Sequence, residues 1–133
     1  MSYIPKYILK RLVPSDSVKK VGDELNITFV NVLSPINVSE EFPEDLSGKI
    51  KVSIDGKPIS EDIIFNTELD IEGKSYKVTD LKTLKGTTIP LGSKILIRVP
   101  DKEKMVETGK TYKFSIWIYE SGNLSFDIER TVN

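Results

Sequence analysis

Short runs in which apolar and polar residues alternate recur along the chain. The run at 112–119 reads YKFSIWIY, and its residues form two sets: Tyr112, Phe114, Ile116 and Ile118 on one face, and Lys113, Ser115, Trp117 and Tyr119 on the other. A period of two residues is typical of a β-strand with one buried face. The first set is therefore predicted to lie in the core. The pattern leaves open whether Trp117 and Tyr119 are exposed or are covered by a second layer.

Further runs of this kind predict most of the remaining structure. They lie at 7–13, 17–20, 24–33, 49–54, 63–66, 68–78, 93–99 and in a final hairpin at 112–132. Only 79–86 has the pattern of a helix, because Leu81 and Leu84 are three residues apart and Gly86 can end it. We expect an all-β fold, an antiparallel β-sandwich (immunoglobulin-like or jelly-roll-like) of about seven to nine strands. At most one short helix is expected, near 80–85.

Turn residues set the expected register of the hairpins. Asp55-Gly56 is a strong signal for a two-residue turn. A two-residue turn at Gly73-Lys74 would place apolar residues opposite one another, in the pairs Ile71 with Tyr76 and Leu69 with Val78. In the last hairpin, a three-residue turn at 121–123, with Gly122 or Asn123 in the left-handed conformation, would sort the two faces by the pairs Ile118 with Phe126, Ile116 with Ile128, and Trp117 with Asp127.

The composition supports this fold. The 133 residues carry a net charge of −1, with 29% charged and 38% hydrophobic residues, which is typical of one globular domain spanning residues 1–133. Ala and Gln are absent while β-branched residues abound, and this favours strands over helices. No apolar run is long enough for a membrane helix, and the first residues do not resemble a signal peptide. We expect a cytoplasmic protein without membrane contact.

The absence of Cys and His excludes whole classes of site. Disulfides, thiolate chemistry, His-dependent triads and most transition-metal sites need these residues, and the sequence has no Gly-rich phosphate loop. The acidic residues of the loop 34–48 (Glu40, Glu41, Glu44 and Asp45) lack the spacing of a calcium-binding loop. We expect no metal ion, no cofactor and no catalytic residue, so the chain by itself is not expected to be an enzyme.

Charge is unevenly distributed, because the first 20 residues carry a net +4. We expect these charges on the outer face of an edge strand, where Lys residues prevent further strand pairing. Nucleic-acid binding would need a basic groove with aromatic side chains. Trp117 instead shares its face with Asp127 and Glu129, so no nucleic-acid partner is expected.

The best candidate for a contact surface is this second face of the last hairpin: Lys113, Trp117, Tyr119, Asp127 and Glu129. Trp and Tyr are enriched at the centres of protein interfaces, and aromatic rings beside carboxylates also suit sugars. Asp127 and Glu129 alternate on one strand face, a spacing that would allow paired-carboxylate chemistry on glycosides. The alternative is structural: a single Trp in a small sandwich is more often part of the core, and Trp117 would then be covered by a loop or by the second sheet.

The segment before this hairpin resembles the corner of fibronectin-type-III and immunoglobulin-like sandwiches, whose pattern is Leu-x-Pro-Gly-x-x-Tyr. Here Val106 and Thr108 replace the Leu and Pro, while Gly109 and Tyr112 match. The resemblance implies that the Tyr112 hydroxyl bonds to upstream backbone. Tyr112, Gly109 and Gly122 are therefore given structural roles.

A longer series of motifs runs through most of the chain: DSVKKV, VSIDGKPI, DIIF, EGKSYKVTDL and PLGSKILIRVP. From about residue 17 onward this order resembles the small β-sandwich subunit of bacterial C-glycoside deglycosidases. The resemblance implies a partner, a larger barrel subunit that holds the metal and the catalytic residues. The stretches DKEKMVETGK and LSFDIERTVN depart from the family pattern, and no catalytic residue is carried over.

These observations lead to one expected function and one rival. The chain is expected to be a non-catalytic module that binds a protein partner, as an accessory subunit of a larger, sugar-processing enzyme or by self-association. The rival is a stand-alone carbohydrate-binding or carboxylate-dependent sugar-active protein that uses the face of Trp117.

Overall fold

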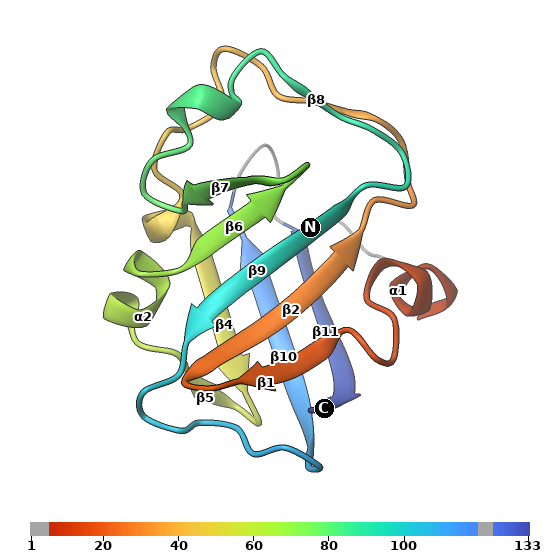
Figure 1. Cartoon of the computed structure of the whole chain (residues 1–133), viewed down its shortest axis with the longest axis vertical. Coiled ribbons are helices and arrows are strands. Elements are labelled where there is room, and N and C mark those ends of the chain that lie inside the picture. The colour runs from red at the N-terminus through yellow and green to blue at the C-terminus, as the bar shows by residue number, and fades with distance from the viewer. Residues whose placement is uncertain (1–5, 120–123) are drawn as a thin grey trace.

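Two antiparallel sheets packed face to face form the body of the molecule (Figure 1). The structure is a computed structural model that describes residues 6–119 and 124–133. The first sheet contains, in spatial order, β1 (Val18–Val21), β2 (Glu24–Val30), β9 (Lys94–Pro100), β6 (Glu68–Ile71) and β7 (Lys74–Lys77). The second contains β11 (Leu124–Thr131), β10 (Thr111–Ile118), β4 (Ile50–Ile54) and β5 (Lys57–Pro58). The predicted all-β sandwich is confirmed.

The strand count is higher than expected, with 11 strands in the described part of the chain. The additional pair is a small ribbon of β3 (Ile36–Asn37) and β8 (Thr88–Ile89), which arches over one end of the sandwich (Figure 1). The loop 34–48, predicted to be irregular, thus contributes one strand of this arch. The other strand of the arch, β8, follows η2 (Lys82–Leu84). This single 3₁₀ turn lies where a helix near 80–85 was expected.

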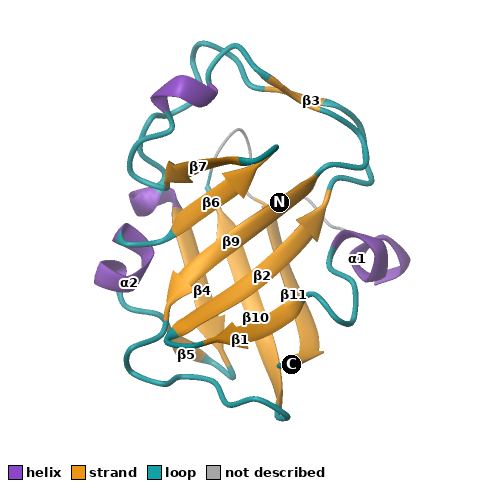
Figure 2. Ribbon diagram, in the orientation of Figure 1, coloured by secondary structure: helices purple, strands orange, loops and turns teal. Residues whose placement is uncertain are grey.

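Two short α-helices replace predicted strands, and Figure 2 shows the helical segments outside the space between the sheets. The first is α1 (Lys6–Leu12), where a strand was expected at 7–13. Leu9, Leu12 and Val13 recur at helical spacing, and Leu9 and Val13 are buried in the core. Lys10 and Arg11 are exposed on the opposite side. The β-rich composition favoured a strand, but the local period of the apolar residues is helical.

The second helix is α2 (Glu61–Phe65), where a strand was expected at 63–66. The Ser60 hydroxyl caps it by accepting a hydrogen bond from the Ile63 backbone N–H at 3.3 Å, and Glu61 and Asp62 lie in its first turn. A polar cap followed by acidic residues is a helix start signal. At five residues the helix is too short for its apolar residues to show a helical period.

Tight turns govern the β4–β5 and β6–β7 hairpins. Asp55 and Gly56 have φ of +50° and +81°, and Ile54 lies opposite Lys57, so the predicted two-residue turn is confirmed. The β6–β7 turn lies at Glu72-Gly73, with φ of +52° and +77°, and the predicted turn at Gly73-Lys74 is wrong. The observed pairs are Ile71 with Lys74 and Leu69 with Tyr76. A type I′ turn needs two left-handed residues, with Gly preferred second.

The register of β10 and β11 also differs from the prediction by two residues. Ile118 lies opposite Leu124, Ile116 opposite Phe126, and Trp117 opposite Ser125. An even shift keeps every side chain on its predicted face, but it excludes the pairs expected from a three-residue turn at 121–123. That turn itself lies outside the described residues.

Arg130 lies on the same face of β11 as the apolar residues Phe126 and Ile128. It lies opposite Tyr112, and its Nε donates a hydrogen bond to the Val13 carbonyl at 2.9 Å, just after α1. Burial lowers the pKa of its guanidinium. The side chain thus leaves the sheet at the edge next to α1 instead of entering the core.

Backbone hydrogen bonds close the sandwich on the side of β1. The Asn133 N–H donates to the Val18 carbonyl at 2.9 Å, and the Asn133 carbonyl accepts from the Lys20 N–H at 2.9 Å. The residues after β11 therefore bond to β1 of the other sheet. The core between the sheets includes Val13, Val18, Leu25, Phe114 and Val132, which are almost completely buried.

Candidate functional site

A groove of about 730 Å³ lies on the outer face of the second sheet, between that sheet and α2. We call it the Trp117 groove and define it by six of its lining residues: Ser53, Pro58, Phe65, Ser115, Trp117 and Asp127. Its floor comes from β4, β10 and β11, whose outward residues alternate with the buried ones. Its opposite wall comes from β5 and α2. The packing of this helix against the sheet therefore sets the width of the groove.

Cross-strand pairing orders the floor of the groove into two rows. One row is Lys51, Trp117 and Ser125, and the next is Ser53, Ser115 and Asp127. Directly opposite residues in antiparallel strands have neighbouring side chains. Trp117 is thus the one aromatic side chain in its row, between Lys51 and Ser125. Because the neighbouring serines are small, the floor beside the indole is concave.

Trp117 is exposed, which answers the question left open by its strand pattern. Its exposed fraction is 37%, and no described residue of α1 lines the groove. The indole stacks on the Tyr119 ring, with centroids 5.0 Å apart and planes at 22°. Lys51 Nζ lies 5.6 Å from the centroid of the Tyr119 ring, within cation–π range. Tyr119 and Lys51 therefore hold the indole from one side.

Phe65 supplies a second exposed aromatic ring to the same groove. Its exposed fraction is 55%, and it is the last residue of α2. On the helix, Ile63 and Ile64 turn into the core, and this fixes the direction of Phe65. Two aromatic side chains from elements far apart in sequence thus face one concave surface.

The predicted site residues come together only in part. Trp117 and Asp127 line the groove, and Tyr119 stacks on Trp117. Lys113 Nζ lies 3.8 Å from Asp127 Oδ2, with both side chains more than half exposed. Lys113 faces Glu129 in the register, and Glu129 is exposed outside the groove. The predicted set is therefore one surface whose centre is Trp117 and whose periphery is Lys113 and Glu129.

Sequence reasoning missed Phe65, Pro58, Lys51 and Ser53. Lys51 and Ser53 alternate with the inward residues of β4, so their face was predictable once β4 was known to pair with β10. Phe65 was not, because its segment was expected to be a strand. Only the capping signal at Ser60 pointed to the helix that carries it.

The two carboxylates of β11 stand in an open environment. Asp127 and Glu129 are both exposed, whereas a general acid on a glycoside typically lies in an apolar pocket. This arrangement is best suited to non-covalent binding, because it presents aromatic ring faces, hydroxyl groups and side chains of both charges on a concave surface. Among the described residues, no group of three acidic side chains is placed to hold a metal ion.

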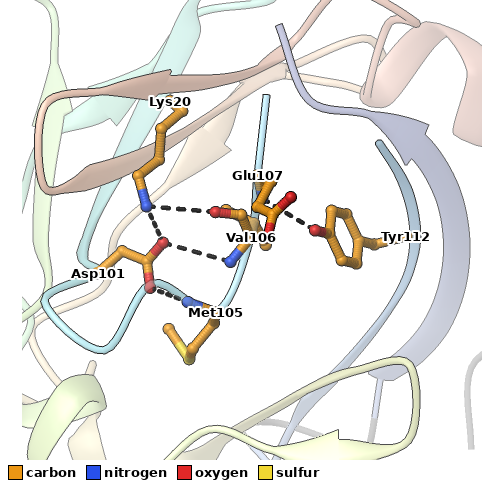
Figure 3. Close-up of polar contacts among 6 residues, drawn as sticks. All are labelled: Lys20, Asp101, Met105, Val106, Glu107 and Tyr112. Atoms are coloured by element: carbon orange, nitrogen blue, oxygen red, sulfur yellow. Dashed lines mark hydrogen bonds and ion pairs between the residues drawn. The ribbon is translucent and has the colours of Figure 1, made fainter. Parts of the chain in front are cut away.

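Of the residues assigned structural roles, Gly109 lies in the loop between β9 and β10 and Tyr112 lies near the start of β10, and Figure 3 shows Tyr112 beside this loop. The Tyr112 hydroxyl accepts a hydrogen bond from the Glu107 backbone N–H at 2.9 Å. Gly109 has φ of +90°, a conformation that requires glycine, and its N–H donates to the Val132 carbonyl at 2.7 Å. Gly122 lies outside the described residues.

The acidic loop is held by one ion pair to a distant residue and by hydrogen bonds within the loop. Glu44 pairs with Lys85 at 3.2 Å. Asp45 accepts hydrogen bonds from the Ser47 hydroxyl at 2.6 Å and from the Ser47 N–H at 2.8 Å. These bonds hold the pKa of the Asp45 carboxyl below its ordinary value.

No protein-family model matches the chain, and no curated protein matches it. Within the part of the chain that the structure describes, no helix has the length and apolar character to cross a membrane.

Proposed function

We propose that this chain is a non-catalytic binding module that docks a protein partner through the Trp117 groove. The observation that carries the proposal is the exposed pair of aromatic side chains, Trp117 and Phe65, in one concave surface. The partner side is expected to insert an apolar or aromatic side chain between them.

The surroundings of these rings have the composition of an interface. Interface centres are enriched in Trp and other aromatic residues, while their rims are polar. Trp117 has serines beside it on the floor, where Lys51 and Asp127 also lie, and Glu61 belongs to the wall from α2, so the surrounding charges are mixed. Tyr119 already stacks on the indole, so little side-chain freedom is lost on docking.

The accessory role rests on the sequence motifs. Their order resembles the small β-sandwich subunit of C-glycoside deglycosidases, which works beside a larger catalytic subunit. The exposed carboxylates and the lack of His and Cys are consistent with a chain whose partner supplies the chemistry. We therefore propose the larger subunit of a sugar-processing enzyme as the partner.

One observation favours a second candidate, a carbohydrate ligand. The indole of Trp117 has Ser115 and Asp127 beside it in the groove, and a ring face with neighbouring hydroxyl and carboxylate groups suits a sugar. The two candidates use the same surface but differ in the size of the occupant.

The test is to co-express the chain with the protein encoded beside it and to measure the complex by native mass spectrometry and calorimetry. Trp117→Ala and Phe65→Ala should each raise Kd about 30-fold, because a hot-spot residue contributes about 2 kcal/mol or more. Val21→Ala is the matched control, since Val21 is an exposed apolar residue on β1 of the other sheet, and it should change Kd less than twofold.

Two outcomes would overturn the proposal. If Trp117→Ala and Phe65→Ala bind like the unchanged chain, the groove is not the interface. If the chain stays monomeric and a panel of soluble glycans binds with saturation that Trp117→Ala abolishes, the carbohydrate candidate replaces it.

A further inference from the structure

A second space lies inside the sandwich, between the two sheets. It is a cavity of about 350 Å³, separated from the Trp117 groove by β4 and β10. We call it the inter-sheet cavity and define it by six inward-facing residues: Phe29, Ile50, Ile95, Ile97, Ile118 and Phe126. Phe29, Ile95, Ile97, Ile118 and Phe126 line this cavity but not the groove, and Ser53, Ser115, Trp117 and Asp127 line the groove but not the cavity. The two spaces share a wall made of Ile50, Val52, Ile59, Ile64 and Ile116.

The burial of inward-facing residues shows where the sandwich is hollow. On β2, Leu25 and Ile27 are buried, whereas Phe29 on the same face is only half-buried. On β4, Ile54 is buried and Ile50 is half-buried. The inward-facing residues of β9, β10 and β11 also change from buried to half-buried toward this same end of the sandwich. One end of the sandwich is therefore closely packed, and the other end leaves apolar surface facing an interior space.

The open end lies under the β3–β8 arch. Leu33 and Ile36 line the cavity and are nevertheless 58% and 42% exposed. They belong to the strand and connection that rise from β2 into the arch (Figure 1). Apolar residues that reach both the cavity and solvent mark a route of entry.

The lining offers almost nothing to a polar ligand. Among the described residues that line the cavity, only Asn31 and Thr67 are polar. The Asn31 amide donates to the carbonyls of Ser34 and Pro90 at 2.8 and 3.1 Å, and the Thr67 hydroxyl donates to the Ile63 carbonyl at 2.9 Å. An apolar cavity without free hydrogen-bond donors does not hold water well and takes apolar molecules instead.

We infer that the inter-sheet cavity binds a single aliphatic chain of medium length. Ligand sites usually measure about 300–1,000 Å³, and a lining without charge selects hydrocarbon. The sheets stand about 10 Å apart in sandwiches, and the rise from Leu25 to Phe29 is about 13 Å. A slot of this shape accommodates one extended, flexible chain better than a thick ring system.

The test uses the chain labelled at its Ile δ1 methyl groups and titrated with decan-1-ol. Saturable shifts and contacts to the ligand are expected at Ile95, Ile97 and Ile118, which line the cavity but not the Trp117 groove. The internal controls are Ile89 and Ile128, which are buried but do not line the cavity, and their signals should stay in place.

Cavity-filling variants separate true binding from adsorption. Ile97→Phe should weaken decan-1-ol binding at least tenfold, and Leu96→Phe is the matched control because Leu96 precedes it on β9 and faces the other way. Ile95→Phe is the second filling variant, for use if Ile97→Phe does not fold. Binding that is unchanged in the folded filling variants, or shifts at Ile89 and Ile128 as large as those in the lining, would overturn the inference. So would a titration without any shift.

Discussion

The ammonium group of Lys20 on β1 forms an ion pair with the carboxylate of Asp101, which is fully buried just after β9 (Figure 3). Asp101 also accepts a hydrogen bond from the Met105 N–H at 2.6 Å, and Lys20 donates to the Val106 carbonyl at 3.4 Å. One buried carboxylate thus holds the loop that leads into β10 against the first sheet. Lys20, one of the basic residues within the first 20 positions, therefore has a structural role as the partner of Asp101.

Breaking this pair should destabilise the fold strongly. Lys20→Met leaves an unpaired buried carboxylate, so urea denaturation should show a loss of about 3 kcal/mol in unfolding free energy. Asp101→Asn should have a similar effect, and the double variant should lose less than the sum of the two. Glu107→Gln is the control, because it breaks only the exposed pair with Lys110, and it should leave the urea midpoint in place. An additive double variant would contradict the interaction.

The hydroxyl of Tyr112 should make a smaller contribution. Tyr112→Phe removes its hydrogen bond with the Glu107 N–H and keeps the ring, so we expect a loss of about 1 kcal/mol in unfolding free energy. Tyr7→Phe changes an exposed tyrosine and should have no effect in the same urea titration. Equal midpoints for both variants would exclude a stabilising role for this bond.

Asn31 should control the opening of the β3–β8 arch. Asn31→Ala removes the bonds from its amide to the carbonyls of Ser34 and Pro90, with an expected cost of about 2 kcal/mol for the buried groups. Hydrogen exchange should accelerate at the Val38 and Gly86 amides, which bond across the arch. Asn66→Ala removes an exposed amide bond to Asp62 and should leave this exchange unchanged. Uniform acceleration across the whole core would instead indicate global destabilisation.

The hydrogen bonds of Ser47 should give Asp45 a pH-dependent role. Because the pKa of Asp45 is lowered from 3.8, its contribution to stability is complete above that pH and is lost as pH falls through the lower folded-state value. Ser47→Ala should raise the pKa of Asp45 in a carboxyl NMR titration, and Ser47→Thr should keep it low because the hydroxyl remains. An unchanged pKa in Ser47→Ala would show that these bonds do not form in solution.

Local patterns predicted the strand faces well. On β9, Ile95, Ile97 and Val99 face inward as expected, because alternation depends only on neighbouring residues. Registers were less predictable, since a shift by two residues preserves the faces. Arg130 of β11 bonds to the Val13 carbonyl, a contact across 117 residues that no local pattern encodes.

The candidate site was predictable only where it belongs to one hairpin. Trp117, Tyr119 and Asp127 were expected to share a face, and they do. Phe65 joins them through the packing of α2 against the sheet, which no local pattern encodes. The inter-sheet cavity was not predictable either, because each of its residues reads simply as core.

The chain has a single Trp, and its position on β10 gives the molecule an intrinsic optical reporter. Trp117 lines the groove but not the cavity, while the adjacent Ile118 lines the cavity but not the groove. Tryptophan emission should therefore change when the groove is occupied and respond far less when only the cavity is filled. Fluorescence of the unlabelled chain can thus distinguish the two proposed sites from each other.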